Sequence, residues 1–196
     1  MFTGIITNVT KIKRAQNVNN GLLLTFDRPY NWTHLEAGES IATDGVCLTI
    51  TQVRSNEYDC LLMPETLRAS TFGKIVPKKV NLERSLGLKD KLGGHIVQGH
   101  VDTVSEITNI KMSQEARLYF SLPNKFKALV INKGSVAING VSLTVAGLEG
   151  DSFCVALIPY TLENTSLRNL EVGDLVNVEF DIIGKYILRS QQNAKS

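Results

Sequence analysis

The sequence has few cysteines and no arrangement of them that suggests a cross-linked or metal-bound fold. Three cysteines occur in 196 residues, Cys47, Cys60 and Cys154, and none belongs to a CxxC pair. Disulfide frameworks use even sets of cysteines and zinc ribbons use closely spaced pairs. The thiols are therefore predicted to be free, with no metal site.

The chain also lacks long apolar runs and a strong net charge. No segment approaches the roughly 18 apolar residues of a membrane span, and the amino end, MFTGIITNVTKIKR, has no signal-peptide pattern. These absences predict a cytoplasmic protein without membrane contact. Lys and Arg number 21 against 19 Asp and Glu, and there is one Trp, so a nucleic-acid partner is not indicated. Neither GxxxxGK[ST] nor GxGxxG occurs, which argues against a nucleotide-phosphate loop.

What the chain does contain is an internal repeat. SIATDGVCLT, which starts at Ser40, matches SVAINGVSLT, which starts at Ser135, at six of ten positions and an offset of 95 residues. The same offset carries LLMPETL onto ALIPYTL and Gly4 onto Gly99, and a one-residue slip aligns VNLE with VNVE. The sequence therefore indicates a tandem duplication.

The period of the repeat predicts two small domains, residues 1–95 and 96–184, followed by a terminal helix at 185–196. Within each half, short runs of β-forming residues alternate with turn formers such as Asp44-Gly45 and Asn139-Gly140. An all-β fold follows, and about six strands per half fit a closed antiparallel barrel better than an open sheet. Helical turns are predicted after Pro64 and Pro159, and helical spacing is found over residues 123–131.

The duplicated loops carry the first candidate site. Strand alternation puts Cys47 and Thr49 on one face, and likewise Ser142 and Thr144. One such loop alone would be read as a Thr-lined strand after a turn. A thiol in one copy and a hydroxyl in the other suggests two related ligand sites with different tasks.

Two further residues are candidates. GGHIVQGHV contains His95 and His100 on opposite faces of a strand, which does not suit a metal site. His95 is interpreted as structural and His100 as functional, because His100 is a titratable group where the first repeat has Ile5. Asp181, in VNVEFDIIG, is either a turn residue or a carboxylate near an apolar pocket.

Segments along the whole chain resemble the riboflavin synthase family (alpha-chain type) of lumazine-binding repeat proteins: MFTGII, the CLT and SLT loops, GGHIVQGHVD, IPYTLENTSL and VNVEFDIIGKY. The resemblance implies two tandem, similar six-stranded Greek-key barrels and a short carboxy-terminal helix, assembled as a homotrimer. It implies that each barrel binds one 6,7-dimethyl-8-ribityllumazine. The family's reaction transfers a four-carbon unit between two lumazines and gives riboflavin and 5-amino-6-ribitylaminouracil, with no cofactor or metal.

The resemblance also implies functional residues. The working site would lie between the amino-terminal barrel of one subunit and the carboxy-terminal barrel of its neighbour, and association with lumazine synthase is left open. The catalytic candidates are Cys47, His100, Ser142 and Asp181, with their individual roles unassigned. The substrate-binding candidates are Gly4, Ile5, Ile6, Cys47, Leu48, Thr49, Leu61, Leu62, Met63, Pro64, Glu65, Thr66, Gly99, His100, Val101, Lys133, Ser142, Leu143, Thr144, Ala156, Leu157, Ile158, Pro159, Tyr160 and Thr161.

Two other functions compete with the enzyme. A noncatalytic lumazine or flavin carrier of the antenna type would share the fold, but the presence of Cys47, His100, Ser142, Thr144 and Asp181 favours the enzyme. A small-barrel module for oligonucleotides or sugars would need aromatic platforms and a basic groove, which this composition does not favour.

Overall fold

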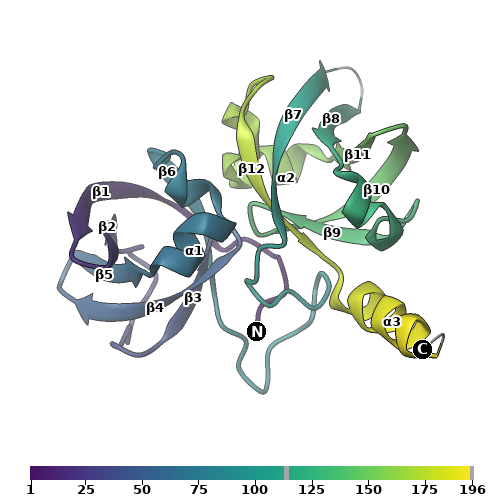
Figure 1. Ribbon diagram of the computed structural model, residues 1–196. Helices are drawn as coiled ribbons and strands as arrows, with labels where there is room; N and C mark the ends of the chain where they lie inside the picture. The colour runs from purple at the N-terminus through teal and green to yellow at the C-terminus, as the bar shows by residue number, and fades with distance from the viewer. Residues whose placement is uncertain (113–114, 195–196) are drawn as a thin grey trace.

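The computed structural model describes residues 1–112 and 115–194 and consists of two closed antiparallel β-barrels placed side by side (Figure 1). The amino terminus lies between the barrels, and a helix after the last strand projects away from the second barrel. The prediction of two tandem six-stranded barrels is confirmed. In the described residues no helix is long and apolar enough to cross a membrane.

The two barrels have the same strand order. In the first, the order around the barrel is β1-β2-β5-β4-β3-β6, and in the second the equivalent order is β7-β8-β11-β10-β9-β12. The strands of the first barrel are β1 (Asn8–Val18), β2 (Gly21–Asp27), β3 (Ser40–Thr43), β4 (Val46–Val53), β5 (Glu57–Leu62) and β6 (Lys79–Arg84). Those of the second are β7 (Thr103–Met112), β8 (Ala116–Ser121), β9 (Ser135–Ile138), β10 (Val141–Glu149), β11 (Ser152–Leu157) and β12 (Leu175–Phe180).

The repeat extends to irregularities of the sheets. Register shifts occur between Ile12 and Arg14 and between Ile50 and Gln52 in the first barrel. The second barrel has them between Ile107 and Asn109 and between Val145 and Gly147, each 95 residues later. Bulges of this kind bend strands and increase twist, which allows a small sheet to close on itself.

The helices are short except for the last. Helices α1 (Pro64–Ala69) and α2 (Pro159–Asn164) each begin at a proline, where a missing N–H costs nothing. Residues 123–131 form a short 3₁₀ helix, Asn124–Leu129, rather than an α-helix. Two further 3₁₀ turns follow α1 and α2, at Thr71–Gly73 and Ser166–Asn169.

Helix α3 (Ile182–Asn193) starts three residues before the predicted boundary at Lys185, because Asp181 accepts a hydrogen bond from the N–H of Ile183 and caps the helix. The ammonium group of Lys185 lies 2.6 Å from the carboxylate of Asp102. This ion pair ties the first turn of α3 to the chain just before β7.

Each barrel has its own hydrophobic core, and a third small cluster joins the two. The joining cluster consists of Phe2, Ala42, Val97 and Ala137, with Cys47 packed against it. Phe2 is fully buried, and its backbone forms a two-residue antiparallel bridge with Val97. The amino terminus is thus part of the contact between the barrels.

The side chains of two asparagines form hydrogen bonds from one barrel to the other. Asn81 of β6 donates from its side-chain amide to the carbonyl of Asn139, and Asn177 of β12 donates in the same way to the carbonyl of Asp44. The side-chain oxygens accept from the N–H groups of Ser166 and Thr71 respectively. These are the asparagines of the aligned VNLE and VNVE segments, so the duplicated motif fastens each barrel to a turn of the other.

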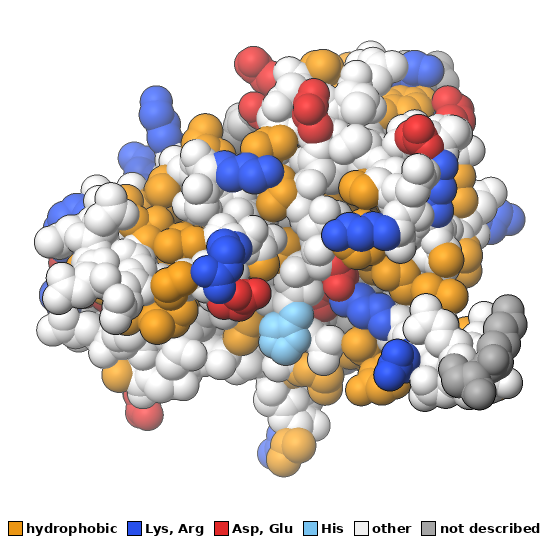
Figure 2. Space-filling model, viewed as in Figure 1, with side chains coloured by type: hydrophobic (Ala, Val, Ile, Leu, Met, Phe, Trp, Pro, Cys, Tyr) orange, Lys and Arg blue, Asp and Glu red, His pale blue; other side chains and the backbone are white. Residues whose placement is uncertain are grey.

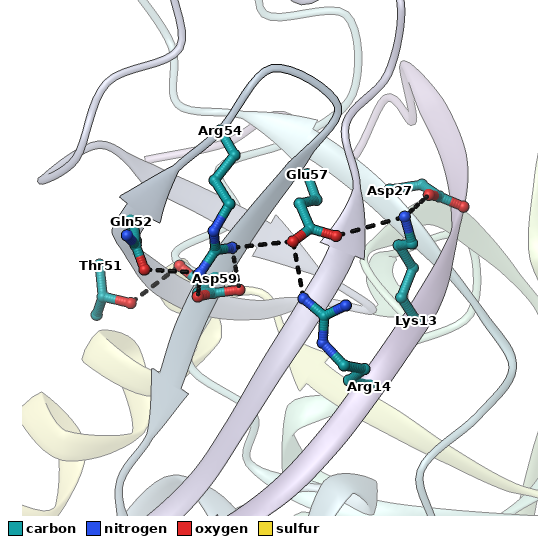
Figure 3. Close-up of polar contacts among 8 residues, drawn as sticks. All are labelled: Lys13, Arg14, Asp27, Thr51, Gln52, Arg54, Glu57 and Asp59. Carbon is teal, nitrogen blue, oxygen red and sulfur yellow. Dashed lines mark hydrogen bonds and ion pairs between the residues drawn. The ribbon is translucent and has the colours of Figure 1, made fainter.

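Charged residues at one end of the first barrel form an ion-pair network (Figure 3). Glu57 forms ion pairs with Lys13, Arg14 and Arg54. Arg54 forms a second ion pair with Asp59, in which a guanidinium nitrogen lies 2.7 Å from a carboxylate oxygen. The hydrogen bond from Arg54 lowers the pKa of Asp59, and that from Arg14 lowers the pKa of Glu57. Both carboxylates are held ionised by cations, so this network is structural rather than an acid-base pair.

The tips of two equivalent hairpins meet at the centre of the contact. Asp44 and Asn139 hold equivalent positions, and each side chain accepts from the N–H of the asparagine in its own barrel. Burial raises the pKa of Asp44 to about 8, against the lowering effect of the Asn81 hydrogen bond. At neutral pH the carboxyl is therefore protonated, and its partner in the repeat is the neutral isostere Asn.

Burial of Asp44 predicts a pH-dependent loss in the free energy of unfolding, and the substitution Asp44→Asn should remove this loss. Between about pH 4 and pH 8 the carboxyl ionises in the unfolded chain but stays protonated in the fold, so wild-type stability falls across this range. Urea unfolding from pH 4 to pH 9 should show the advantage of Asp44→Asn growing up to about pH 8 and then levelling. The mirror substitution Asn139→Asp should be destabilising over the same range. Parallel stability curves for the wild type and Asp44→Asn would contradict the burial argument.

Candidate functional sites

The two CLT and SLT loops form equivalent strands whose outward side chains alternate with core residues. In β4, Cys47 is half-buried and Thr49 exposed, while Leu48 between them is 3% exposed and lies in the barrel core. In β10, Ser142, Leu143 and Thr144 repeat the pattern. The predicted alternation is confirmed, and each barrel presents one reactive side chain beside a threonine.

An extended arm from outside the barrel covers each of these strands. The carbonyl of Gly99 accepts from the N–H of Cys47 at 2.9 Å, and the carbonyl of Gly4 accepts from the N–H of Ser142 at 2.8 Å. Both glycines have positive φ, +79° and +76°, and a Cβ on either would stand 2.6 Å from the Cβ of the covered residue. Glycine is required at both positions by backbone conformation and by close approach.

Each arm covers a strand of the barrel to which it does not belong in sequence. Gly4 and Ile6 precede the first barrel in sequence but lie against the second, where Ile6 packs on the hydrophobic core. Gly99 and Val101 precede the second barrel but lie against the first, where Val101 packs on the core. His100 is thereby placed next to the Cys47 strand. The matching neighbour of Ser142 is Ile5.

Two buried glutamates hold the arms in place. Glu83 accepts from the N–H groups of Thr3 and Gly4, and Glu179 accepts from those of Gln98, Gly99 and His100. Burial raises the pKa of both glutamates, while the N–H donors act in the opposite direction. These are the glutamates of VNLE and VNVE, and a buried acid repeated in two apolar strands was the available sequence signal. Neither glutamate is among the residues that the sequence predicted for the sites.

The second site contains a histidine that the sequence interpretation made structural. His95 Nδ1 lies 2.7 Å from the hydroxyl oxygen of Ser142, and a Cβ on Gly94 would stand 2.8 Å from that oxygen. Burial lowers the pKa of His95, and the negative charge of Asp181 partly offsets this effect. His95 Nε2 is buried with no hydrogen-bond partner in the described part of the chain. The structure therefore groups Ser142, His95 and Asp181, and the neutral imidazole is able to accept a proton.

No histidine among residues 1–94 is equivalent to His95 at the repeat offset. The two sites are thus equipped differently. The first has a thiol with His100 on its covering arm, and the second has a hydroxyl hydrogen-bonded to a buried imidazole.

Lys133 stands near the second site in an unusual backbone conformation. Its φ is +65°, and its N–H donates to the carbonyl of Val145 just after Thr144. The equivalent residue in the first repeat is Gly38, which has φ +94° and donates to Ile50. A lysine kept where glycine would be less strained fits a functional role for this cation.

The remaining candidates divide into core and exposed residues. Leu48, Leu62, Leu143 and Leu157 have side chains in the barrel cores, so only their backbone groups can meet a ligand. By contrast, Ile5, Met63, Ile158 and Tyr160 are 47% to 71% exposed. The remaining exposed candidates include Leu61, Pro64, Glu65 and Pro159, while Thr66, Ala156 and Thr161 are half-buried.

Apolar side chains are exposed on both barrels on the face shown in Figure 2, mixed with basic and acidic ones. Within the residues that the structure describes, no group of three His, Cys, Asp or Glu side chains is arranged to hold a metal ion.

Comparison with known sequences gives one family across both barrels. The sequence model of the lumazine binding domain matches residues 3–85 and again residues 98–181. A protein from Brucella abortus named riboflavin synthase is 39% identical, with 100% of each chain covered. Proteins of the same name from Bacillus subtilis and Actinobacillus pleuropneumoniae are 39% and 38% identical, covering 96% and 95% of this chain and 89% and 88% of theirs.

Solved structures show the same fold. LumP complexed with riboflavin superposes with a TM-score of 0.84 at 24% identity, covering 92% of this chain and 99% of that one. LumP complexed with 6,7-dimethyl-8-(1'-D-ribityl)lumazine gives a TM-score of 0.82 at 22% identity, with the same coverage.

The close contact of Gly99 with Cys47 predicts a specific sensitivity to a methyl group. Gly99→Ala should lower the free energy of unfolding by about 2 to 4 kcal/mol, because it adds overpacking to the cost of a positive φ. Gly38→Ala is the matched control: its φ is +94° but nothing lies within 4 Å of the added Cβ. It should lose only about 1 kcal/mol in denaturant unfolding. Equal losses would show that the covering arm does not press on β4.

Proposed function

The chain belongs to the riboflavin synthase family, and we propose that it converts two molecules of 6,7-dimethyl-8-ribityllumazine into riboflavin and 5-amino-6-ribitylaminouracil. Its curated relatives over the full length are enzymes of this name. The observation that carries the proposal is the pair of equivalent sites with different reactive groups. A reaction between two identical substrates that take different roles needs such a pair.

The chemistry requires a proton acceptor and a nucleophile. One lumazine loses a proton from its C7 methyl group, and the other is activated by addition of a nucleophile before the four-carbon unit is transferred. We assign the acceptor to the second site, where His95 is hydrogen-bonded to Ser142 and near Asp181. We assign the addition to the first site, where the thiol of Cys47 or a water held by His100 serves. Holding both heterocycles face to face supplies the proximity that the transfer needs.

We further propose that the protein works as a cytoplasmic homotrimer in which units 1–95, 96–184 and 185–196 are the two binding units and the contact helix. Support comes from apolar side chains that stand exposed in the single chain. They include Ile5, Met63, Ile158 and Tyr160 at the sites, and Ile183, Tyr186 and Ile187 on α3. A neighbouring subunit would cover these surfaces and bring a first site opposite a second site.

Incubation of the protein with the lumazine tests the activity directly. We expect the flavin absorption band to appear together with the pyrimidine product. A noncatalytic carrier would bind the lumazine and shift its fluorescence without forming flavin, and that result would overturn the proposed reaction while leaving the binding sites in place.

Single substitutions should separate the catalytic groups from surface residues. Cys47→Ala and His100→Gln should each lower turnover by a factor on the order of 10 to 10⁴, the range for loss of a positioned nucleophile or acid-base group. His34→Asn is the control, because His34 is exposed on a loop of the first barrel and already has a positive φ of 56°. Steady-state kinetics and unfolding midpoints should be measured together. A variant with wild-type turnover would remove its residue from the mechanism.

Subunit mixing tests whether the reacting pair of sites spans two chains. Because His100 lies with Cys47 and not with Ser142, a Cys47→Ala chain and a Ser142→Ala chain damage opposite halves of the reacting pair. Refolding these two variants together should restore activity at about a quarter of the contacts between chains.

The matched control for mixing is Cys47→Ala with His100→Gln. Both substitutions damage the first site, so mixed trimers should show no gain over either variant alone. If the Cys47→Ala and Ser142→Ala mixture also shows no gain, with mixed trimers verified by mass, the reacting sites belong to one chain.

A further inference from the structure

A cavity between the two barrels lies apart from both candidate sites. Its volume is about 710 Å³, which is within the usual range for small-molecule sites. It is lined by Asp44, Thr71, Lys74, Ile75, Pro77, Lys78, Lys79, Asn139, Ser166, Asn169, Leu170, Gly173, Asp174 and Leu175. None of these residues belongs to the set of catalytic and substrate-binding candidates.

The cavity sits where the two repeats meet. Its walls come from the hairpin tips at Asp44 and Asn139 and from the segments that follow α1 and α2. Most lining residues are equivalent pairs at the repeat offset, such as Thr71 with Ser166 and Ile75 with Leu170. The shape is therefore nearly symmetric, and the charges are not.

The first repeat supplies three cations that the second lacks. Lys74 corresponds to Asn169 at the offset of 95, and Lys78 and Lys79 correspond to Asp174 and Leu175 after the one-residue slip. In the described parts of the chain none of the three lysines takes part in an ion pair. The carboxylate of Asp174 accepts a hydrogen bond from the N–H of Glu171. Cations therefore outnumber ionised carboxylates on the lining, because buried Asp44 is protonated at neutral pH.

A buried hydroxyl and an apolar surface complete the cavity. Ser166 Oγ is buried and has no hydrogen-bond partner in the described residues, although it lies on the lining. A buried polar atom without a partner is costly, and a ligand oxygen would satisfy it. Ile75, Pro77, Leu170 and Leu175 provide apolar contact for the body of a ligand.

We propose that this cavity, defined by Lys74, Lys78, Lys79 and Ser166, is a second binding site that takes an organic phosphate of about mononucleotide size. The phosphate lies among the lysines and accepts from Ser166 Oγ, which rotation about the Cα–Cβ bond turns from its buried position toward the cavity. A flat apolar ring system rests on Ile75, Pro77, Leu170 and Leu175. Lysine suits this role as a point charge on a flexible stem, which needs no fixed bidentate geometry.

Calorimetric titration of the full-length protein at constant ionic strength tests the phosphate half of the proposal. Inorganic pyrophosphate is the probe, since it has no heterocycle with which to enter the lumazine sites. We expect saturable binding of one pyrophosphate per chain. The double variant Lys74→Gln, Lys78→Gln should weaken binding at least about tenfold, and Ser166→Ala should weaken it about threefold or more.

The matched control is Lys89→Gln, Lys91→Gln, which removes the same charge from an exposed loop outside the cavity. It should bind pyrophosphate like the wild type. Absence of saturable binding, or an equal loss in both double variants, would overturn the site in favour of general charge attraction. Unfolding midpoints of each variant show whether the fold is retained.

A second titration tests the apolar half. Adenosine 5′-monophosphate and ribose 5-phosphate carry the same charged group, and only the first has a flat ring. Tighter binding of the nucleotide, by about fivefold or more, that is lost in the Lys74→Gln, Lys78→Gln variant supports a ring resting on the apolar residues of this cavity. Equal binding would contradict that part. Neither titration uses turnover as its readout, so failure of the proposed synthase activity does not affect the result.

Discussion

The exchange of covering arms between the barrels is the constraint on which the rest of the structure depends. Each arm must leave its own barrel, cross the contact and lie on a strand of the other, and five N–H groups of the two arms then need partners. The carboxylates of Glu83 and Glu179 satisfy those groups. The positive φ of Gly4 and Gly99 allows the close approach, and the asparagines beside the glutamates fix the distance between the barrels.

The sequence predicted what the repeat and strand periodicity control. The six-stranded barrels and the hairpin turns at Asp44 and Asn139 follow from local patterns. So does the shared strand face of Cys47 with Thr49 and of Ser142 with Thr144. The partners of His95 do not, because its hydrogen bond to Ser142 joins distant parts of the chain and has no equivalent in the repeat. Packing also decides which barrel His100 lies against. Strand alternation predicts the face of the strand on which a residue lies, but not the barrel that this face contacts.

The two barrels share one backbone framework, and the chemistry of the sites differs at a few equivalent positions. The two equivalent strands differ in having a thiol at Cys47 and a hydroxyl at Ser142. The two hairpin tips differ in having a carboxyl group at Asp44 and an amide at Asn139. Lys133 stands where the first repeat has Gly38, and the cavity between the barrels has lysines on the side of the first repeat only. The barrels preserve backbone hydrogen bonding and core packing, so chemistry can change at these positions without altering the fold.

The crossing of the arms also has a consequence for the order in which the protein matures on the ribosome. All strands of the first barrel have been synthesised once the chain reaches Arg84. The arm that covers its candidate site is synthesised later, because it includes Gly99. The arm for the second barrel, by contrast, precedes β1 in the chain and must wait for β10. Until the second half is complete, Gly4 and its neighbours have no surface to cover. Neither binding surface is complete in a nascent first barrel, so ligand binding must follow the docking of the two halves.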